Sequence, residues 1–156
     1  MSGIGREAIY GRFFEYLKAQ LHDAPRAPFR YCSRRYRPPG QQGQEAYPLF
    51  YAVGAGEEYD RTSLYLPAKV TLFAHITIQT LDGNDPDVIT ETELNDLADA
   101  TEDAITAVSS ATGQSILGGL VQEAWINGRQ THNPATSSGR FSEQIIAVEL
   151  IRPRVR

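Results

Sequence analysis

Cysteine, histidine and long apolar runs are scarce in this sequence, and each shortage excludes a class of site. Cys32 is the only cysteine, which rules out a disulfide within the chain and a cysteine-based zinc site. The three histidines, His22, His75 and His132, stand at no metal-ligand spacing from one another or from Cys32. No apolar run is long enough to span a bilayer, and the charged N-terminus does not resemble a signal peptide. We therefore expect no metal, no cofactor and no membrane contact in a protein made in the cytoplasm.

What the sequence does contain indicates one globular domain over residues 1–156. Its hydrophobic content of 41% and charged content of 22% are ordinary for a soluble domain. The formal net charge of -4 argues against a dedicated nucleic-acid binder, although a local basic patch could still touch DNA.

Two helices are predicted from apolar residues at helical spacing. The first runs from Ile4 to Leu21, with Ser2 as a candidate N-cap. The second runs from Thr90 to Ser110 and opens with the capping-box pattern of Thr90 to Glu93. Its apolar positions are Leu94, Leu97, Ala98, Thr101, Ile105 and Val108.

Five strands are predicted, and the clearest is Ala68–Leu81, where large apolar residues alternate with others. One set should face the core and pack on the second helix: Val70, Leu72, Ala74, Ile76 and Ile78. Pro48 suggests an edge position for its strand, because a central strand needs every N–H. The other four strands are Phe29–Arg37, Tyr47–Val53, Leu120–Asn127 and Ser142–Ile151.

This element order predicts an α+β domain with a largely antiparallel, mixed sheet and two main helices packed on one face. Long inter-strand loops are expected at Pro38–Ala46, Gly54–Pro67 and Gly128–Gly139. We expect these loops to make contacts with partners, so that shortening Gly54–Pro67 should leave the subunit folded.

Each candidate for chemistry has a plainer structural explanation. Cys32 lacks a local nucleophile signature and fits a half-buried structural residue. Gly54–Gly56 lacks the rest of a phosphate loop, and Asp82–Asp85 does not continue as a calcium loop. The carboxylates of Glu91–Asp103 fit a solvated helix face. We expect no enzyme activity; the alternative is a small hydrolase or ligand-binding domain that uses His75 or His132 with nearby carboxylates.

Arginines interleaved with tyrosines over residues 30–37 are the one feature that hints at nucleic acid. A patch at a subunit interface explains them equally well, and the acidic total favours the interface. The candidate assembly interface comprises Arg30, Arg34, Arg35, Arg37, Tyr59, Arg61, Tyr65, His75, Arg129 and His132.

Four segments in a characteristic order give the sequence a family resemblance: IYGRFFEYLKA, LPAKVTLFAHITIQT, SILGGLVQEAWINGR and IIAVELIRP. Together they resemble the tail terminator, or tail-completion, proteins of tailed bacteriophages. The resemblance implies a virion protein that forms a homo-hexameric ring, caps the tail tube and provides the surface that joins tail to head. The implied partners are the tail tube protein and head-completion or connector proteins. Viral DNA would pass through the lumen without specific binding. The family has no catalytic residues to carry over. Another phage neck protein, a head-completion or stopper subunit, is the alternative.

Overall fold

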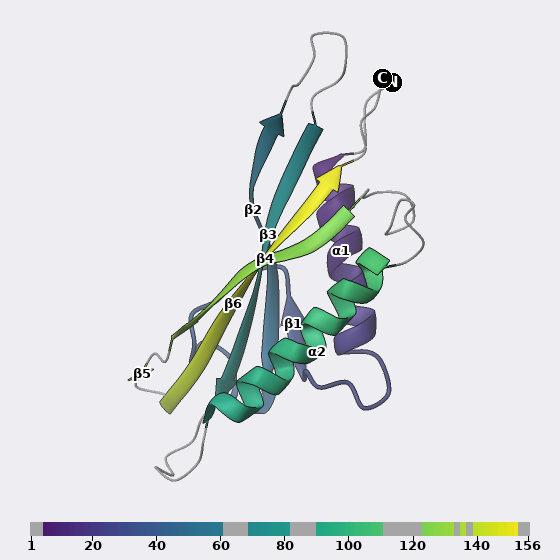
Figure 1. Cartoon of the computed structure of the whole chain (residues 1–156). Helices are drawn as coiled ribbons and strands as arrows, with labels where there is room; N and C mark the ends of the chain where they lie inside the picture. Colours follow the sequence, from purple (N-terminus) through teal and green to yellow (C-terminus); the bar gives the residue numbers. More distant parts are fainter. Residues whose placement is uncertain are drawn as a thin grey trace.

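The computed structural model describes residues 5–60, 69–81, 90–110, 123–132, 135–136 and 139–152, and these form an α+β domain. Figure 1 shows the sheet with both helices on one side of it. The α-helices are α1 (Arg6–Leu21) and α2 (Thr90–Ser110), and a 3-10 turn, η1, covers Gln44–Ala46. The strands are β1 (Tyr31–Ser33), β2 (Leu49–Asp60), β3 (Lys69–Leu81), β4 (Glu123–His132), β5 (Ala135–Thr136) and β6 (Gly139–Arg152). The predicted fold class is confirmed.

The sheet is antiparallel except at one edge. Its order is β1-β2-β3-β6-β4, and β5 pairs with β6. Only β1 runs parallel to its neighbour, and it covers β2 for just three residues, Leu49–Tyr51. Beyond Tyr51, in the described part of the chain, β2 pairs with β3 alone. The sheet therefore ends on one side at the far half of β2 and on the other side at β4.

The main core lies between the sheet and the two helices. Alternate residues of β3 point into it, because side chains along a strand take opposite faces. All five β3 residues predicted to be buried are buried, and Leu94, Leu97 and Ile105 of α2 lie in the same cluster as four of them. The remaining predicted partner, Val108, has a side chain outside the described set. From α1 the core receives Ile9, Phe13, Leu17 and Leu21.

A second, smaller cluster lies on the opposite face of the sheet. Leu49 and Tyr51 alternate with Phe50 and Ala52, which belong to the main core, so the two pairs face opposite ways. The small cluster comprises Tyr47, Leu49, Tyr51 and Phe141. Tyr31 and Ala46 pack against this cluster. The chain between β1 and β2 therefore lies over this end of the sheet.

Several predicted boundaries are wrong because backbone pairing extends beyond the apolar sequence pattern. Residues Gly54–Asp60, predicted as part of a loop, continue β2, and β4, β5 and β6 take up most of the loop predicted at Gly128–Gly139. Removing Gly54–Asp60 would therefore remove half of a strand. The β2 strand is also not an edge strand at Pro48, which precedes its first residue, because β1 covers its start.

The ends of two other elements also differ from the prediction. The strand predicted over Phe29–Arg37 is reduced to β1, because Arg34 turns to α1 and the Arg35 N–H bonds to the Ser33 side chain. Helix α1 begins after Gly5 with no side-chain cap, so Ser2 is not its N-cap. Asp82–Asp85, considered above as a calcium loop, lies outside the described residues.

Candidate assembly surface

Arginines gather where the chain leaves β1 and turns away from the sheet. We call residues 30–37 the arginine segment. Arg30, Arg34, Arg35 and Arg37 are all exposed. Within the described residues, only one of these four guanidinium groups has a partner. Arg34 donates from both of its terminal nitrogens to the Glu7 carboxylate on α1, one of them at 3.1 Å. These hydrogen bonds lower the pKa of Glu7.

Buried polar contacts fix the backbone of the arginine segment while its charged ends remain in solvent. The Arg30 N–H donates to the Pro48 carbonyl at 2.9 Å, and Gln79 Nε2 donates to the Arg37 carbonyl at 2.9 Å. The Tyr36 hydroxyl donates to Glu143 Oε2 at 3.0 Å, and Gln79 also donates to that oxygen at 2.7 Å. Burial of its ring and the neighbouring carboxylate raise the pKa of Tyr36 to about 12. These hydrogen bonds therefore hold the arginine segment in place against the sheet.

Glu143 anchors the arginine segment, and the sequence pattern did not indicate this role. Its carboxylate is only 2% exposed, and it lies on β6 opposite Gln79 of β3 and His132 of β4 in the strand register. A buried carboxylate requires hydrogen-bond donors, and Tyr36 and Gln79 are two of them. Nothing in the sequence signals this pairing, because the three residues are far apart along the chain.

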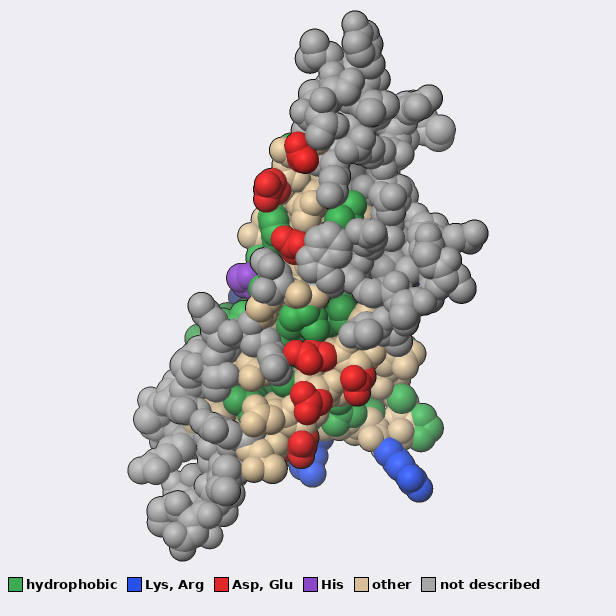
Figure 2. Space-filling view, viewed as in Figure 1, with side chains coloured by type: hydrophobic (Ala, Val, Ile, Leu, Met, Phe, Trp, Pro, Cys, Tyr) green, Lys and Arg blue, Asp and Glu red, His purple; other side chains and the backbone are tan. Residues whose placement is uncertain are grey.

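An acidic stripe lies along the solvent side of α2. We define it by Asp96, Asp99 and Asp103, which are three and four residues apart and therefore share one helix face. The buried residues Leu94, Ala98 and Ile105 of the same helix point into the core. Figure 2 shows a row of acidic side chains over α2. All three aspartate side chains are exposed, which confirms the prediction of a solvated helix face at these positions.

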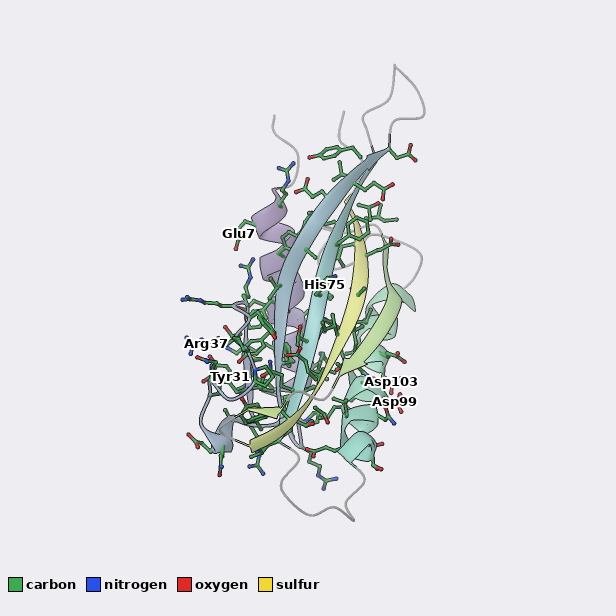
Figure 3. The ribbon with its side chains drawn as sticks, turned by 90° about the vertical axis from the view of Figure 1, so that its left-hand side faces the viewer. Glu7, Tyr31, Arg37, His75, Asp99 and Asp103 are labelled. Atoms are coloured by element: carbon green, nitrogen blue, oxygen red, sulfur yellow. The ribbon has the colours of Figure 1, made fainter. Side chains whose placement is uncertain are left out.

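The arginine segment and the acidic stripe lie at opposite lateral sides of the molecule. Figure 3 shows the sheet from its helix-free face, with Arg37 and Tyr31 at one side and Asp99 and Asp103 at the other. The topology explains this separation: β1 begins the strand order, whereas β4, which α2 contacts, ends it. The exposed arginines and the acidic stripe therefore lie on opposite lateral sides of the subunit.

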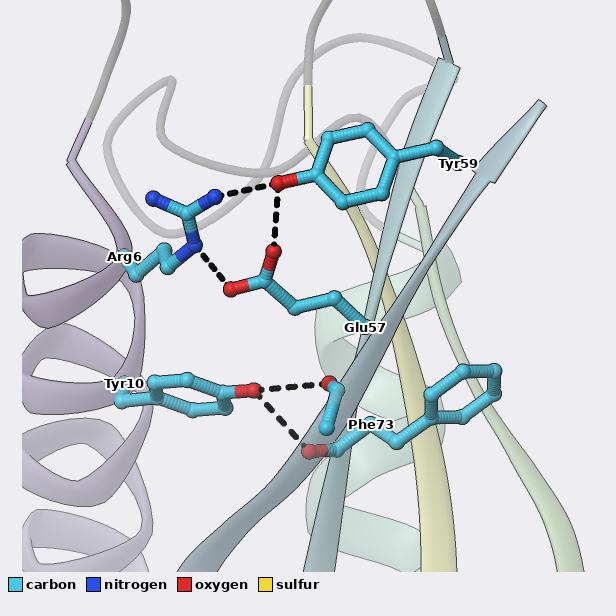
Figure 4. Close-up of polar contacts among 6 residues, drawn as sticks. Arg6, Tyr10, Glu57, Tyr59 and Phe73 are labelled. Carbon is cyan, nitrogen blue, oxygen red and sulfur yellow. Dashed lines mark hydrogen bonds and ion pairs between the residues drawn. The ribbon is translucent and has the colours of Figure 1, made fainter.

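The far half of β2 is tied to the start of α1. Arg6 donates to Glu57 and to the hydroxyl of Tyr59, and that hydroxyl donates to Glu57 at 2.8 Å (Figure 4). Tyr59 is nevertheless 57% exposed. The bond to Glu57 raises the pKa of Arg6, which remains charged.

A bulge interrupts the β2 and β3 pairing beside this cluster. The register shifts between Gly54 and Gly56, and the Tyr10 hydroxyl reaches the carbonyls of Gly56 at 3.2 Å and Phe73 at 3.1 Å. A bulge disrupts ladder hydrogen bonds, and Tyr10 supplies a donor in its place.

Of the five remaining residues of the predicted interface, only His75 has a described side chain. His75 is exposed on the sheet face opposite the helices, where its register neighbours are Val53 and Ala147. Neither neighbour is ionisable, so the register gives a general acid or base no partner there. Arg129 and His132 lie in β4, and their side chains are outside the described set. Arg61 and Tyr65 also lie outside the described residues.

The contacts of Cys32 and His22 are those of structural residues. Cys32 is half-buried against the main core, as predicted, and burial raises the pKa of its thiol to about 11. A thiol with that pKa is a poor nucleophile at neutral pH. The His22 ring contacts the Asp23 carboxylate of the next residue at 2.7 Å on the surface.

Within the described ranges, no three His, Cys, Asp or Glu side chains form a group suited to a metal ion. No helix of the described part has the length and apolar character to span a membrane.

Comparisons with known proteins give a weak structural likeness. No family model and none of the curated proteins match the sequence. One solved structure with a similar chain is titled "Virion of native gene transfer agent (GTA) particle". The similarity covers 88% of this chain and 84% of that chain, at 13% sequence identity and a TM-score of 0.45. Values this low do not establish a common fold or function.

Proposed function

We propose that this chain is a structural subunit of a tailed phage-like particle, and specifically a tail terminator. In this proposal, subunits close into a homo-hexameric ring on the end of the tail tube. The ring then offers the surface to which the head-completion or connector proteins bind. The order of the four sequence segments supports this assignment, and the geometry of the sheet supports assembly. The likeness to a virion chain is too weak to add to either.

The observation that carries the proposal is a sheet with an open edge on each side. In the described part of the chain, β2 beyond Tyr51 and the whole of β4 each have one strand neighbour. Unpaired strand edges are usually covered in stable proteins, because their free N–H and C=O groups can pair with another chain. Neighbouring subunits in a ring would cover these edges.

The arginine segment and the acidic stripe lie on different lateral sides, which suits a head-to-tail contact. An interface between two different surfaces repeats from subunit to subunit and closes into a ring when the rotation allows it. The formal net charge of -4 is compatible with a lumen through which DNA slides, since like charges do not adhere.

Native mass spectrometry and negative-stain electron microscopy of the purified chain test ring formation. We expect six-subunit rings with an open centre. A chain that stays monomeric at every concentration and salt tested would contradict the proposal.

Deletion of the gene from its parent phage tests which position the protein occupies in the particle. For a tail terminator, we expect filled heads and unjoined, overlong tails, and restoration of particles when the gene is supplied in trans. Tails of normal length that fail only to join heads would indicate another neck protein, a head-completion or stopper subunit.

A further inference from the structure

Six charged side chains on the lateral sides lack partners inside the described subunit. The guanidinium groups of Arg30, Arg35 and Arg37 make no hydrogen bond or ion pair with another described residue. The same holds for the acidic stripe on α2. Arg34, by contrast, is already bound to Glu7. The free arginines and the free aspartates therefore remain available to a second molecule.

The two groups cannot meet within one subunit. They lie on opposite lateral sides, with the sheet and α1 between them (Figure 3). Both are presented on supported elements: the arginines on the segment fixed by Tyr36 and Gln79, and the aspartates on a helix packed into the core. A charged group that is already held in place loses less conformational entropy on binding than a mobile one.

We infer that the arginine segment of one subunit binds the acidic stripe of the next, so that charge complementarity sets the head-to-tail contact. This inference rests on the proposed ring and names the surfaces that build it. Because the chain itself displays both complementary surfaces, a second copy is favoured as the occupant over DNA, which would leave the aspartates unexplained. Opposite charges placed across an interface fix its register and suppress wrong pairings.

Charge reversal of each side gives two variants with complementary defects. The first is Asp99→Lys with Asp103→Lys, and the second is Arg35→Glu with Arg37→Glu. Arg34 is left unchanged because it holds the segment to α1. The matched control is Glu15→Lys with Glu149→Lys, which changes net charge as the first variant does but lies on α1 and on the helix-free face of the interior strand β6, away from both open edges of the sheet. Far-ultraviolet circular dichroism and thermal unfolding check that every variant is folded.

Each charge-reversed variant should fail to assemble alone, because its two lateral sides now carry the same sign. We expect its subunit dissociation constant to rise on the order of 100-fold at low salt, since like charges across an interface are strongly unfavourable. A one-to-one mixture should restore rings, because each variant complements the other on both sides. Native mass spectrometry should then find equal numbers of the two variants in each ring. Wild-type rings should also loosen as salt rises.

The outcomes separate this inference from the proposed ring. Wild-type protein that never assembles would overturn the ring and this contact together. If the wild type forms rings and either reversed variant does so equally well, or if mixing restores nothing, this contact is wrong while the ring stands. Intact rings of the Arg35→Glu and Arg37→Glu variant that no longer retain a DNA duplex would show that the arginines bind nucleic acid instead. The control should assemble as the wild type does.

Discussion

At the residue scale, Gly54 packs closely against the ring of Tyr10. A Cβ atom on Gly54 would lie 3.0 Å from Cζ of Tyr10 and would meet the ring carbons on either side as well. The ring cannot retreat easily, because its hydroxyl bonds across the bulge to Gly56 and Phe73. The glycine therefore lets α1 approach the strand backbone.

Gly54→Ala should destabilise the fold by about 1–3 kcal/mol, because the added methyl group overpacks a close contact. Urea unfolding followed by tryptophan fluorescence measures this. Gly128→Ala is the matched control, since Gly128 also lies beside a bulge but its Cβ would meet nothing within 4 Å. Equal stability of the two variants would contradict the assigned Tyr10 contact.

Cys32 gives a second prediction at this scale. Burial raises the pKa of its thiol from 9.0 to about 11, so the thiolate fraction near pH 8 is about 100-fold smaller than for a free cysteine. Iodoacetamide should label the native protein correspondingly slowly, and the unfolded protein in urea at the normal rate. Mass spectrometry of timed samples measures both rates. Rapid labelling of the folded protein would show an exposed, reactive thiol.

At the element scale, β3 is the centre of the fold, and its buried side chains should dominate stability. Ile76 is fully buried in the main core, whereas Ile145 on β6 points to the opposite face and is only half-buried. Ile76→Ala should cost about 2–5 kcal/mol through lost contacts and a residual cavity. Ile145→Ala removes the same atoms and should cost clearly less. Similar denaturation midpoints for the two variants would contradict the assigned core.

The elements that the sequence predicted well are those whose side chains carry the periodicity. The alternation of β3 and the helical spacing of α2 both arise from burial on one face, so they can be read from the sequence. The far half of β2 could not, because Gly54–Asp60 is polar and glycine-rich and is held by its backbone pairing with β3. A chain segment of that composition resembles a loop until its partner strand is known.

The candidate surface, like the fold, could be predicted from the sequence only in part. The arginines are close in sequence, so the basic patch was predictable from the sequence alone. Its support was not, because Glu143 and Gln79 come from distant strands. The opposition of the acidic stripe to the arginine segment is also a long-range consequence of the strand order, which places β1 and β4 at opposite ends.

At the scale of the whole molecule, wholly or partly buried phenols and the half-buried thiol give the fold a shared response to alkaline pH. The pKa values of Tyr10, Tyr16, Tyr36 and Tyr51 are all raised, mainly by burial, in the same direction as that of Cys32. Burial disfavours the charged phenolate, so the folded chain keeps protons that the unfolded chain releases. Ionisation therefore favours the unfolded state.

The sign of the pH dependence follows from this proton difference. The free energy of unfolding falls with rising pH wherever the folded state binds more protons than the unfolded state. It should begin to decrease as the pH approaches the ordinary pKa of the thiol, 9.0, and should decrease further as the pH rises from the ordinary pKa of tyrosine, about 10, towards the value of about 12 for Tyr36. Urea unfolding at a series of pH values measures the slope. Tyr36→Phe should reduce the slope, since it removes one of the groups that titrate differently in the two states. A free energy of unfolding that stays level between about pH 9 and about pH 11 would contradict the burial assigned to these side chains.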